Sequence, residues 1–414
     1  MQTYSSDYPS KRMRFFFGLT VLFFFQSCVV TRQQTMTTEV SDSFKKMSNL
    51  EKNKQQLVDA HMVERPAKDL VLSFVGDVII HERLRRREVA TGEGYQVIWS
   101  AVQKYLNLAD LRYANLEGPV APDLAEPSGF PRFNYPENIL ISLKQARFDL
   151  VSTANNHALD RGFQGVQSNL KFLKKHHLSH TGTISDETSL LAGHETWWSL
   201  TKLSAVSSDK KIAWISCTEM TNGIRDIKHQ VLYCYKDKKL IFELINQLKH
   251  QDDIAAIILL PHWGEEEVFD IEAHRRRWAH LMLEQGASAI VGSHPHVIQK
   301  IEHYITRDQR QTLIAYSLGN FISNQPWIPN KTSMMLFLKF SLDKAQSKAV
   351  LKDVKALPLW MNRSVASTGT TIFRVVPGWL EKKIPDEARD IWFEQIGEDK
   401  ILKSDAETLH FLSY

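Results

Sequence analysis

Short apolar runs rich in β-branched and aromatic residues recur along residues 69–321, and amphipathic segments separate them. The runs cover residues 69–77, 111–118, 148–157, 211–217, 253–264, 287–296 and 311–321, with helical patterns near 95–108, 162–176, 239–249 and 271–285. Continuous apolar runs are typical of strands buried on both faces, and alternation with helices is typical of parallel sheets. The pattern therefore predicts an α/β protein.

After residue 332 the pattern changes, because SMMLFLKFSL, KAVLKDVKALPLWM and TTIFRVV follow one another without an intervening helix. Neighbouring strands with short connections pair antiparallel, whereas parallel strands need a long crossover. We therefore expect residues 326–414 to extend a sheet edge with antiparallel strands. A helical segment near 385–412 is expected to end the chain, outside a main domain of residues 69–325.

The first 28 residues differ from the rest of the chain. Three basic residues precede the apolar stretch Phe15–Phe25, which at about 1.5 Å per residue is too short to cross a ~30 Å hydrocarbon layer. This pattern predicts an export signal, and Cys28 after it predicts lipidation at a bacterial lipoprotein cleavage site. Ordinary cleavage and an uncleaved short anchor are the alternatives. The polar residues 29–68 are predicted to be a tether, with a helix over 42–59.

Charge and cysteine content exclude several classes of protein. The formal charge is +4, but no stripe of Lys and Arg interleaved with aromatic residues occurs, so nucleic acid is not a predicted partner. The basic runs 83–87 and 274–277 are interpreted as solvated helix faces, with a polyanion contact as the alternative. Beyond Cys28 only Cys217 and Cys234 remain, which predicts one disulfide or two free thiols and no cysteine metal site.

Polar side chains that can bind metal ions stand where several of the predicted strands end. They are Asp77, Glu117, Asn155, Asn156, His157, His262, His294 and His296. In open α/β sheets a site assembles at the carboxyl ends of the strands. Each residue alone is better explained as a turn residue, a helix cap or a core histidine than as a ligand. Together, carboxylate, amide and imidazole groups suit one or two divalent ions such as Mn²⁺, Fe²⁺ or Zn²⁺.

Six motifs follow one another between residues 69 and 325: FVGDVII, ANLEGPV, ANNHALDRG, PHWGEE, VGSHPHV and YSLGNF. This ordered series resembles the signature of the CapA family of poly-γ-glutamate capsule synthesis proteins, which is similar in fold to the calcineurin-like metallophosphoesterases. The resemblance implies two packed, mostly buried β-sheets flanked by helices. It covers neither the N-terminal tether nor the C-terminal residues.

The resemblance, carried over motif by motif, implies a role for each polar residue. The metal ligands would be Asp77, Glu117, Asn156, His262, His294 and His296, with Glu117 in the place of a bridging acid. His157 would be catalytic, as a general acid or as a charge stabiliser facing the substrate. The residues that support the ligands or contact substrate would be Asn155, Asp160, Glu266 and Asn320.

The first motif departs from the metallophosphoesterase pattern, in which a histidine stands two residues after the first aspartate. Here Asp77 is followed by Val78 and Ile79, and His81 stands four residues beyond Asp77. This departure predicts that one of two metal positions is depleted. The site would then hold a single ion, or two ions of unequal affinity.

A site of this composition supports hydrolysis or transfer at a phosphoester or an amide, because a divalent ion activates water and polarises the oxygen under attack. The sequence therefore predicts a metal-dependent protein of capsule polymer synthesis in the bacterial envelope. Its partners would be an anionic polymer or phosphoester substrate, a membrane-bound synthesis or export complex, and the membrane itself. A non-catalytic component that binds the polyanion is the alternative. A decayed site is disfavoured because a decayed site should lose its ligands piecemeal, whereas seven of these residues are retained together: Asp77, Glu117, Asn156, His157, His262, His294 and His296.

Overall fold

The computed structural model describes residues 69–413 apart from residues 194, 204–208, 343–347, 368 and 382. The expected targeting segment, Cys28, the tether and the helix over 42–59 lie outside the described residues. Within the described part of the chain, no helix is both long enough and apolar enough to span a membrane.

The first sheet is built around β1 (Asp69–Val78). Parallel to it and to one another run β2 (Leu111–Leu116), β3 (Leu150–Ser152) and β4 (Ser179–Thr181). On its other side lie three antiparallel strands, β12 (Thr332–Ser341), β13 (Val350–Val365) and β14 (Thr371–Pro377). The predicted antiparallel extension of a sheet edge is therefore confirmed.

The second sheet has β6 (Lys211–Thr218), β7 (Ile254–His262), β8 (Ala289–Val291) and β10 (Gln311–Ala315) in parallel order at its centre. Antiparallel edge strands flank them, β5 (Trp198–Lys202) and β9 (Ile301–Ile305). The predicted strand over 311–321 was wrong, because it consists of two strands in different sheets. Its second part, β11 (Asn320–Ile322), pairs in parallel with the end of β1.

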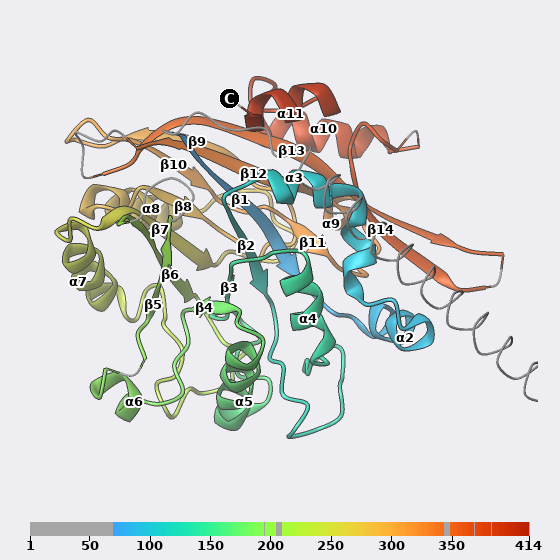
Figure 1. Ribbon diagram of the computed structural model, residues 1–414, viewed down its shortest axis with the longest axis horizontal. Coiled ribbons are helices and arrows are strands. Elements are labelled where there is room, and N and C mark those ends of the chain that lie inside the picture. Colours follow the sequence, from blue (N-terminus) through green and yellow to red (C-terminus); the bar gives the residue numbers. More distant parts are fainter. Residues whose placement is uncertain are drawn as a thin grey trace, which may run out of the picture. The chain divides into compact units, whose positions relative to one another are not determined.

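Helices cover the outer faces of both sheets (Figure 1). Against the first sheet pack the 3₁₀ helix η1 (Tyr95–Val102), α3 (Gln103–Leu108), α4 (Asn138–Gln145) and α5 (Gly162–Lys175). Against the second pack α7 (Lys238–Lys249) and α8 (Ala273–Gln285). The others are α2 (Glu82–Thr91), α6 (Glu187–Leu191), α9 (Ile328–Lys331), α10 (Asp386–Ile396) and α11 (Asp405–Ser413). The predicted C-terminal helix is thus two helices, α10 and α11.

The residues of β1 explain why its sequence is a continuous apolar run. Leu72 and Phe74 point into the core between the two sheets, where the Phe74 ring lies 6.0 Å from that of Trp214 in β6. The intervening Val71 and Val75 point the other way, into the core under the helices. Side chains alternate along a strand, so a strand between two cores is apolar at every position. The predicted architecture of two buried sheets flanked by helices is confirmed.

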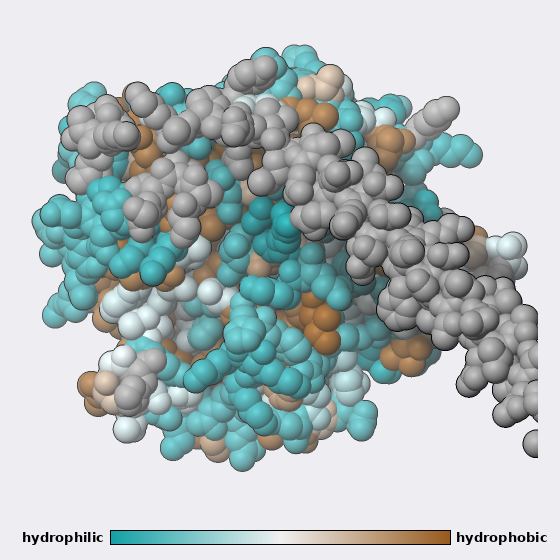
Figure 2. Space-filling view, viewed as in Figure 1, coloured by the Kyte–Doolittle hydropathy of each residue, from teal (hydrophilic) through white to brown (hydrophobic). Residues whose placement is uncertain are grey.

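The surface contrasts with this core. On the face shown in Figure 2, the coloured residues are mostly hydrophilic, and apolar residues stand in small separate groups.

Gly76 lets the end of β1 approach β11 closely. A Cβ atom on Gly76 would lie 1.8 Å from the carbonyl oxygen of Gly319, and that same oxygen accepts the backbone N–H of Asp77 at 3.1 Å. We expect Gly76→Ala to lower the free energy of unfolding by about 3 kcal/mol, because the two backbones must separate. Urea unfolding of the purified protein measures this change.

Gly92→Ala is the control for this prediction. Gly92 has a positive φ of 62°, unlike Gly76, and a Cβ there would meet nothing within 4 Å. The expected cost is only the left-handed backbone strain of about 1 kcal/mol. Equal losses in the two variants would contradict the argument from close approach at Gly76.

Candidate metal centre

The carboxylate and amide groups of the site come from the first sheet. Asp77 lies at the end of β1, Glu117 directly follows β2, and Asn156 stands in the loop after β3. All three side chains are buried. Asn115, inside β2, donates from Nδ2 to Asp77 Oδ1 at 2.8 Å and so fixes that carboxylate.

The histidines come from the second sheet, so the site lies between two sheets rather than along one sheet edge. His262 is the last residue of β7, and His294 and His296 follow β8. Both of the latter have positive φ values, 101° and 59°. They therefore stand in a loop, as the intervening Pro295 suggested. Such a backbone costs about 1–2 kcal/mol per non-glycine residue and is often retained at functional sites.

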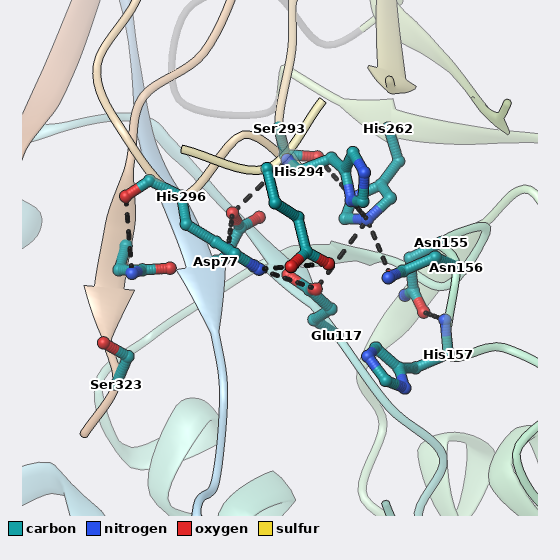
Figure 3. Close-up of polar contacts among 12 residues, drawn as sticks. Asp77, Glu117, Asn155, Asn156, His157, His262, Ser293, His294, His296 and Ser323 are labelled. Carbon is teal, nitrogen blue, oxygen red and sulfur yellow. Dashed lines mark hydrogen bonds and ion pairs between the residues drawn. The ribbon is translucent and has the colours of Figure 1, made fainter. Parts of the chain in front are cut away.

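Two groups of potential ligands share Glu117 (Figure 3). Glu117, His262 and His294 form one group, and Asp77, Glu117 and His296 form the other. Within each group the donor atoms lie within 4.8 Å of one another. Glu117 Oε1 lies 3.8 Å from His262 Nε2 and 3.7 Å from His296 Nε2. A bridging role for Glu117 fits this geometry.

The Glu117 carboxylate is the strongest sign that a cation belongs here. Both of its oxygens are buried, and neither has a hydrogen-bond partner among the described residues. Burial and the nearby Asp77 carboxylate raise the pKa of Glu117 well above its ordinary value. A buried carboxylate without hydrogen bonds is strongly unfavourable, and coordination to a divalent ion would satisfy it. The residues present therefore fit such an ion.

His262 and His294 are held in the neutral state that metal binding needs. Burial, followed by the charge of neighbouring histidines, lowers the pKa of His294 to about 3 and that of His262 well below its ordinary value. His262 Nε2 lies 3.0 Å from Asn156 Oδ1 and 3.1 Å from His294 Nδ1. Ser293 Oγ lies 2.9 Å from His262 Nδ1 and accepts its proton in the tautomer that frees Nε2 for an ion.

His296 differs from the other two histidines in its surroundings. Burial favours its neutral form, but the Asp77 carboxylate, with Oδ2 3.3 Å from His296 Nδ1, raises the pKa of His296 overall. Glu266 adds a half-exposed carboxylate 4.0 Å from His296 Nε2. This second group keeps three potential ligands although no histidine stands two residues after Asp77.

His157 stands beside the two ligand groups and belongs to neither. Its Nδ1 lies 2.7 Å from Asp160 Oδ2, which also accepts the backbone N–H of Phe133 at 2.6 Å. The Phe133 ring packs edge-on against the imidazole at 4.6 Å between centroids. Asp160 and Phe133 therefore fix the ring orientation, and Nε2 is the nitrogen that stays available for proton transfer.

The remaining predicted residues have supporting positions. Asn155 Nδ2 donates to the backbone oxygen of Leu116 at 2.8 Å, and its Oδ1 accepts the N–H of His157, so it shapes the loop after β3. Asn320 pairs with Asp77 across β11 and β1 and donates to the Asn330 carbonyl.

His81 belongs to neither ligand group. Its Nδ1 accepts the backbone N–H of Asn324 at 3.1 Å, and burial, followed by the charges of His296 and His157, lowers its pKa to about 4.

Sequence reasoning missed three residues of the site. Asn115 could have been found, because it stands two positions before Glu117 and successive side chains alternate along β2. Ser293 stands directly before His294, and no sequence pattern marked it as part of the site. Asn222 lies in a distant loop, yet its Nδ2 lies 3.5 Å from both ring nitrogens of His157. A disulfide between Cys217 and Cys234 closes that loop, which resolves the alternatives left open for these two cysteines.

Two packed sheets that bring carboxylate, amide and imidazole groups to one buried centre define an α/β protein with a candidate metal site. The chain belongs to the family of the bacterial capsule synthesis protein PGA_cap, whose model matches residues 71–325. The CapA resemblance carried by the six motifs is therefore confirmed.

Two curated relatives carry related names. The PGA biosynthesis protein CapA of Bacillus subtilis is 29% identical over 273 residues, which cover 64% of this chain and 67% of that protein. The capsule biosynthesis protein CapA of Bacillus anthracis is 26% identical over 286 residues, covering 67% and 65%. The match thus spans about two thirds of these relatives.

A solved structure similar to this chain is the sulfate thiohydrolase SoxB of Thermus thermophilus in complex with glycerol, with 10% identity and a TM-score of 0.39. The alignment covers 80% of this chain and 61% of that one. With so low an identity and TM-score, this similarity says nothing about the site.

Proposed function

We propose that this protein is a divalent-metal-dependent hydrolase or transferase of capsule polymer synthesis. It would act on an amide or phosphoester bond of an anionic polymer or its precursor. The observation that carries this proposal is the Glu117 carboxylate, which is buried, has no hydrogen-bond partner among the described residues, and is shared by two groups of potential ligands.

The chain offers ligands for one or two ions. One position would use Glu117, His262 and His294, with Asn156 beside it, and the other Asp77, Glu117 and His296. This mixture of oxygen and nitrogen ligands suits Mn²⁺, Fe²⁺ or Zn²⁺. A bound ion of this kind lowers the pKa of water and polarises the oxygen under attack.

His157 is the proposed proton-transfer residue. Because Asp160 holds Nδ1, the neutral ring can accept a proton at Nε2, and the protonated ring can donate it to a leaving nitrogen or oxygen. The Asp160 carboxylate stabilises the positive ring that forms in between. Phe133 keeps the ring from turning away.

The names of the relatives support the choice of substrate. Both describe capsule or PGA biosynthesis, and an amide-linked glutamate polymer is an anionic chain with amide bonds. A phosphoester precursor remains the second class of substrate that the ligand chemistry suits.

The envelope location is proposed from the N-terminal sequence. The apolar stretch Phe15–Phe25 followed by Cys28 has the composition of an export signal with a lipidation site. The partners would then be the membrane, through the lipid on Cys28, and a membrane-bound complex that makes or exports the polymer.

Metal content and turnover test this proposal together. The purified full chain is stripped with a chelator, reloaded with Mn²⁺, Fe²⁺ or Zn²⁺, and assayed with γ-glutamyl oligomers and with a simple phosphoester. We expect stoichiometric metal and turnover of one substrate class that chelation abolishes. If the reloaded protein binds γ-glutamyl oligomers but turns over neither substrate, the enzyme proposal fails and the non-catalytic polymer-binding role replaces it.

A further inference from the structure

A surface pocket of about 350 Å³ lies in the loop that the Cys217–Cys234 disulfide closes, here called the 217–234 loop. Three basic residues line it, namely Arg225, His229 and, just beyond the loop, Lys236. Apolar contacts come from Ile224, Ile227 and Tyr233. None of these residues belongs to the two ligand groups of the metal centre.

The same loop reaches the proposed proton-transfer residue. Asn222 Nδ2 lies 3.5 Å from both ring nitrogens of His157. Ile224, in the pocket wall, is two residues further on, and two residues of fully extended chain span at most about 7 Å. One wall residue of the pocket therefore lies within two residues of the side chain that reaches His157.

Internal hydrogen bonds couple the pocket to the loop tip. Thr221 Oγ1 donates to the Ile224 carbonyl at 2.7 Å and lies 3.1 Å from the Tyr233 hydroxyl. The disulfide holds the Cα atoms of Cys217 and Cys234 at 5.0 Å. Asn222 and the pocket wall are thus parts of one closed loop.

The charge of the pocket favours anions. Arg225 and Lys236 are exposed, and neither forms an ion pair with any residue that the structure describes. The acidic lining residue, Asp226, is already occupied, because its carboxylate accepts the backbone N–H groups of Gln230 and Val231 at 3.0 and 2.9 Å. These hydrogen bonds leave the Asp226 charge in place, so Arg225 and Lys236 together give the lining one more positive charge than Asp226 offsets.

We propose that this pocket binds a carboxylate-bearing unit of the anionic polymer, one or two units away from the bond that lies at His157. This inference rests on the proposed function. Arg225 and Lys236 would contact the carboxylate, and Ile224 and Tyr233 would pack against the methylene groups of the chain. Because pocket and centre would bind one continuous chain, affinity should rise with the length of the oligomer.

Binding of a labelled γ-glutamyl oligomer to the full chain, followed by fluorescence anisotropy at low ionic strength, tests the pocket. Arg225→Ala/Lys236→Ala is expected to weaken binding about tenfold, as the loss of two exposed charge contacts predicts. The matched control is Lys239→Ala/Arg389→Ala, which removes the same charge at exposed residues of α7 and α10. The control should bind within about twofold of wild type. Metal content should be unchanged in both.

Two further experiments test which ligand binds and whether the closed loop is needed. Inorganic phosphate and free glutamate should compete only weakly, because neither spans the pocket and the metal centre. Cys217→Ser/Cys234→Ser should weaken oligomer binding as well, since it opens the loop but leaves every proposed metal ligand in place.

Three outcomes would overturn the inference. If the oligomer binds the Arg225→Ala/Lys236→Ala variant as tightly as wild type, the pocket assignment fails while the proposed function stands. If free phosphate or glutamate displaces the oligomer as well as the oligomer displaces itself, the pocket binds small anions and not the polymer. If metal-loaded wild type binds no oligomer, the polymer substrate itself is wrong.

Discussion

Replacing His157 by alanine is expected to lower kcat by a factor of about 100 to 10,000 while the metal content stays unchanged, as loss of a positioned proton-transfer group predicts. His157 belongs to neither ligand group, so the variant should bind ions as wild type does. Single-turnover rates and elemental analysis of the same preparation measure the two quantities. Metal-loaded His157→Ala that turns over substrate at the wild-type rate would remove His157 from the mechanism.

Asp160→Asn should have a smaller effect in the same direction. The amide removes the carboxylate that stabilises a positive ring, but the side chain can still lie beside His157 Nδ1. His176→Ala is the control, because His176, which directly follows α5, also pairs with a carboxylate, that of Glu137 at 2.6 Å. It should leave kcat unchanged. A similar loss in His176→Ala would indicate a general effect on folding instead of a catalytic one.

Glu117→Gln is expected to abolish tight metal binding and yet to stabilise the metal-free protein at neutral pH. The wild-type carboxylate is buried, has no hydrogen-bond partner among the described residues and lies near that of Asp77, so a neutral side chain of the same shape relieves an unfavourable charge. We expect a gain of about 2 kcal/mol in the free energy of unfolding without metal. Added Mn²⁺ or Zn²⁺ should then stabilise wild type and leave the variant unchanged.

The pH dependence gives a second measure of Glu117. Its folded-state pKa lies above the unfolded value, so the folded chain holds an extra proton, and metal-free wild type should lose stability as pH rises from about 4.5 through that pKa. His262 and His294, with lowered pKa values, act oppositely and should cost stability as pH falls below about 6.5. Both proteins contain these histidines, so the difference between wild-type and variant unfolding curves isolates Glu117.

Asp149→Asn is the matched control for Glu117→Gln. Burial also raises the pKa of Asp149, but this carboxylate pairs with Arg112, whose guanidinium lies 3.0 Å away. Removing it should destabilise the protein, because the Arg112 charge is left without its partner. If Glu117→Gln destabilises the metal-free protein as Asp149→Asn does, burial of the Glu117 carboxylate is not unfavourable. The argument that Glu117 is a metal ligand then fails.

Much of the fold was predictable from the sequence because buried strands are apolar at every position. The runs around β1, β2, β6 and β7 were placed to within a few residues. Short strands were missed where a run is brief or polar, as in β4 and β5. The run 311–321 was assigned to one strand because nothing local shows that Leu318-Gly319 moves the chain to the other sheet.

The sequence predicted which side chains gather at the candidate site, but not how they are arranged there. Motif order identified Asp77, Glu117 and the histidines, because metal chemistry restricts the residue types that can serve. Glu117 is shared by two groups of potential ligands because side chains of two different sheets lie close together. No local sequence pattern indicates such distances. Asn222 illustrates the limit, since it reaches His157 from a loop 65 residues further along the chain.

The sequence by itself determined which side chains could bind a cation and on which strand ends they stand, because residue chemistry and hydrophobic periodicity are local properties. Only the tertiary structure decided that the potential ligands come from both sheets, that Glu117 has no hydrogen-bond partner among the described residues, and that Asp160 holds His157. Burial and pairing are set by neighbours distant in the chain. Those neighbours raise the pKa of Glu117, and this is the property that points to a bound metal ion.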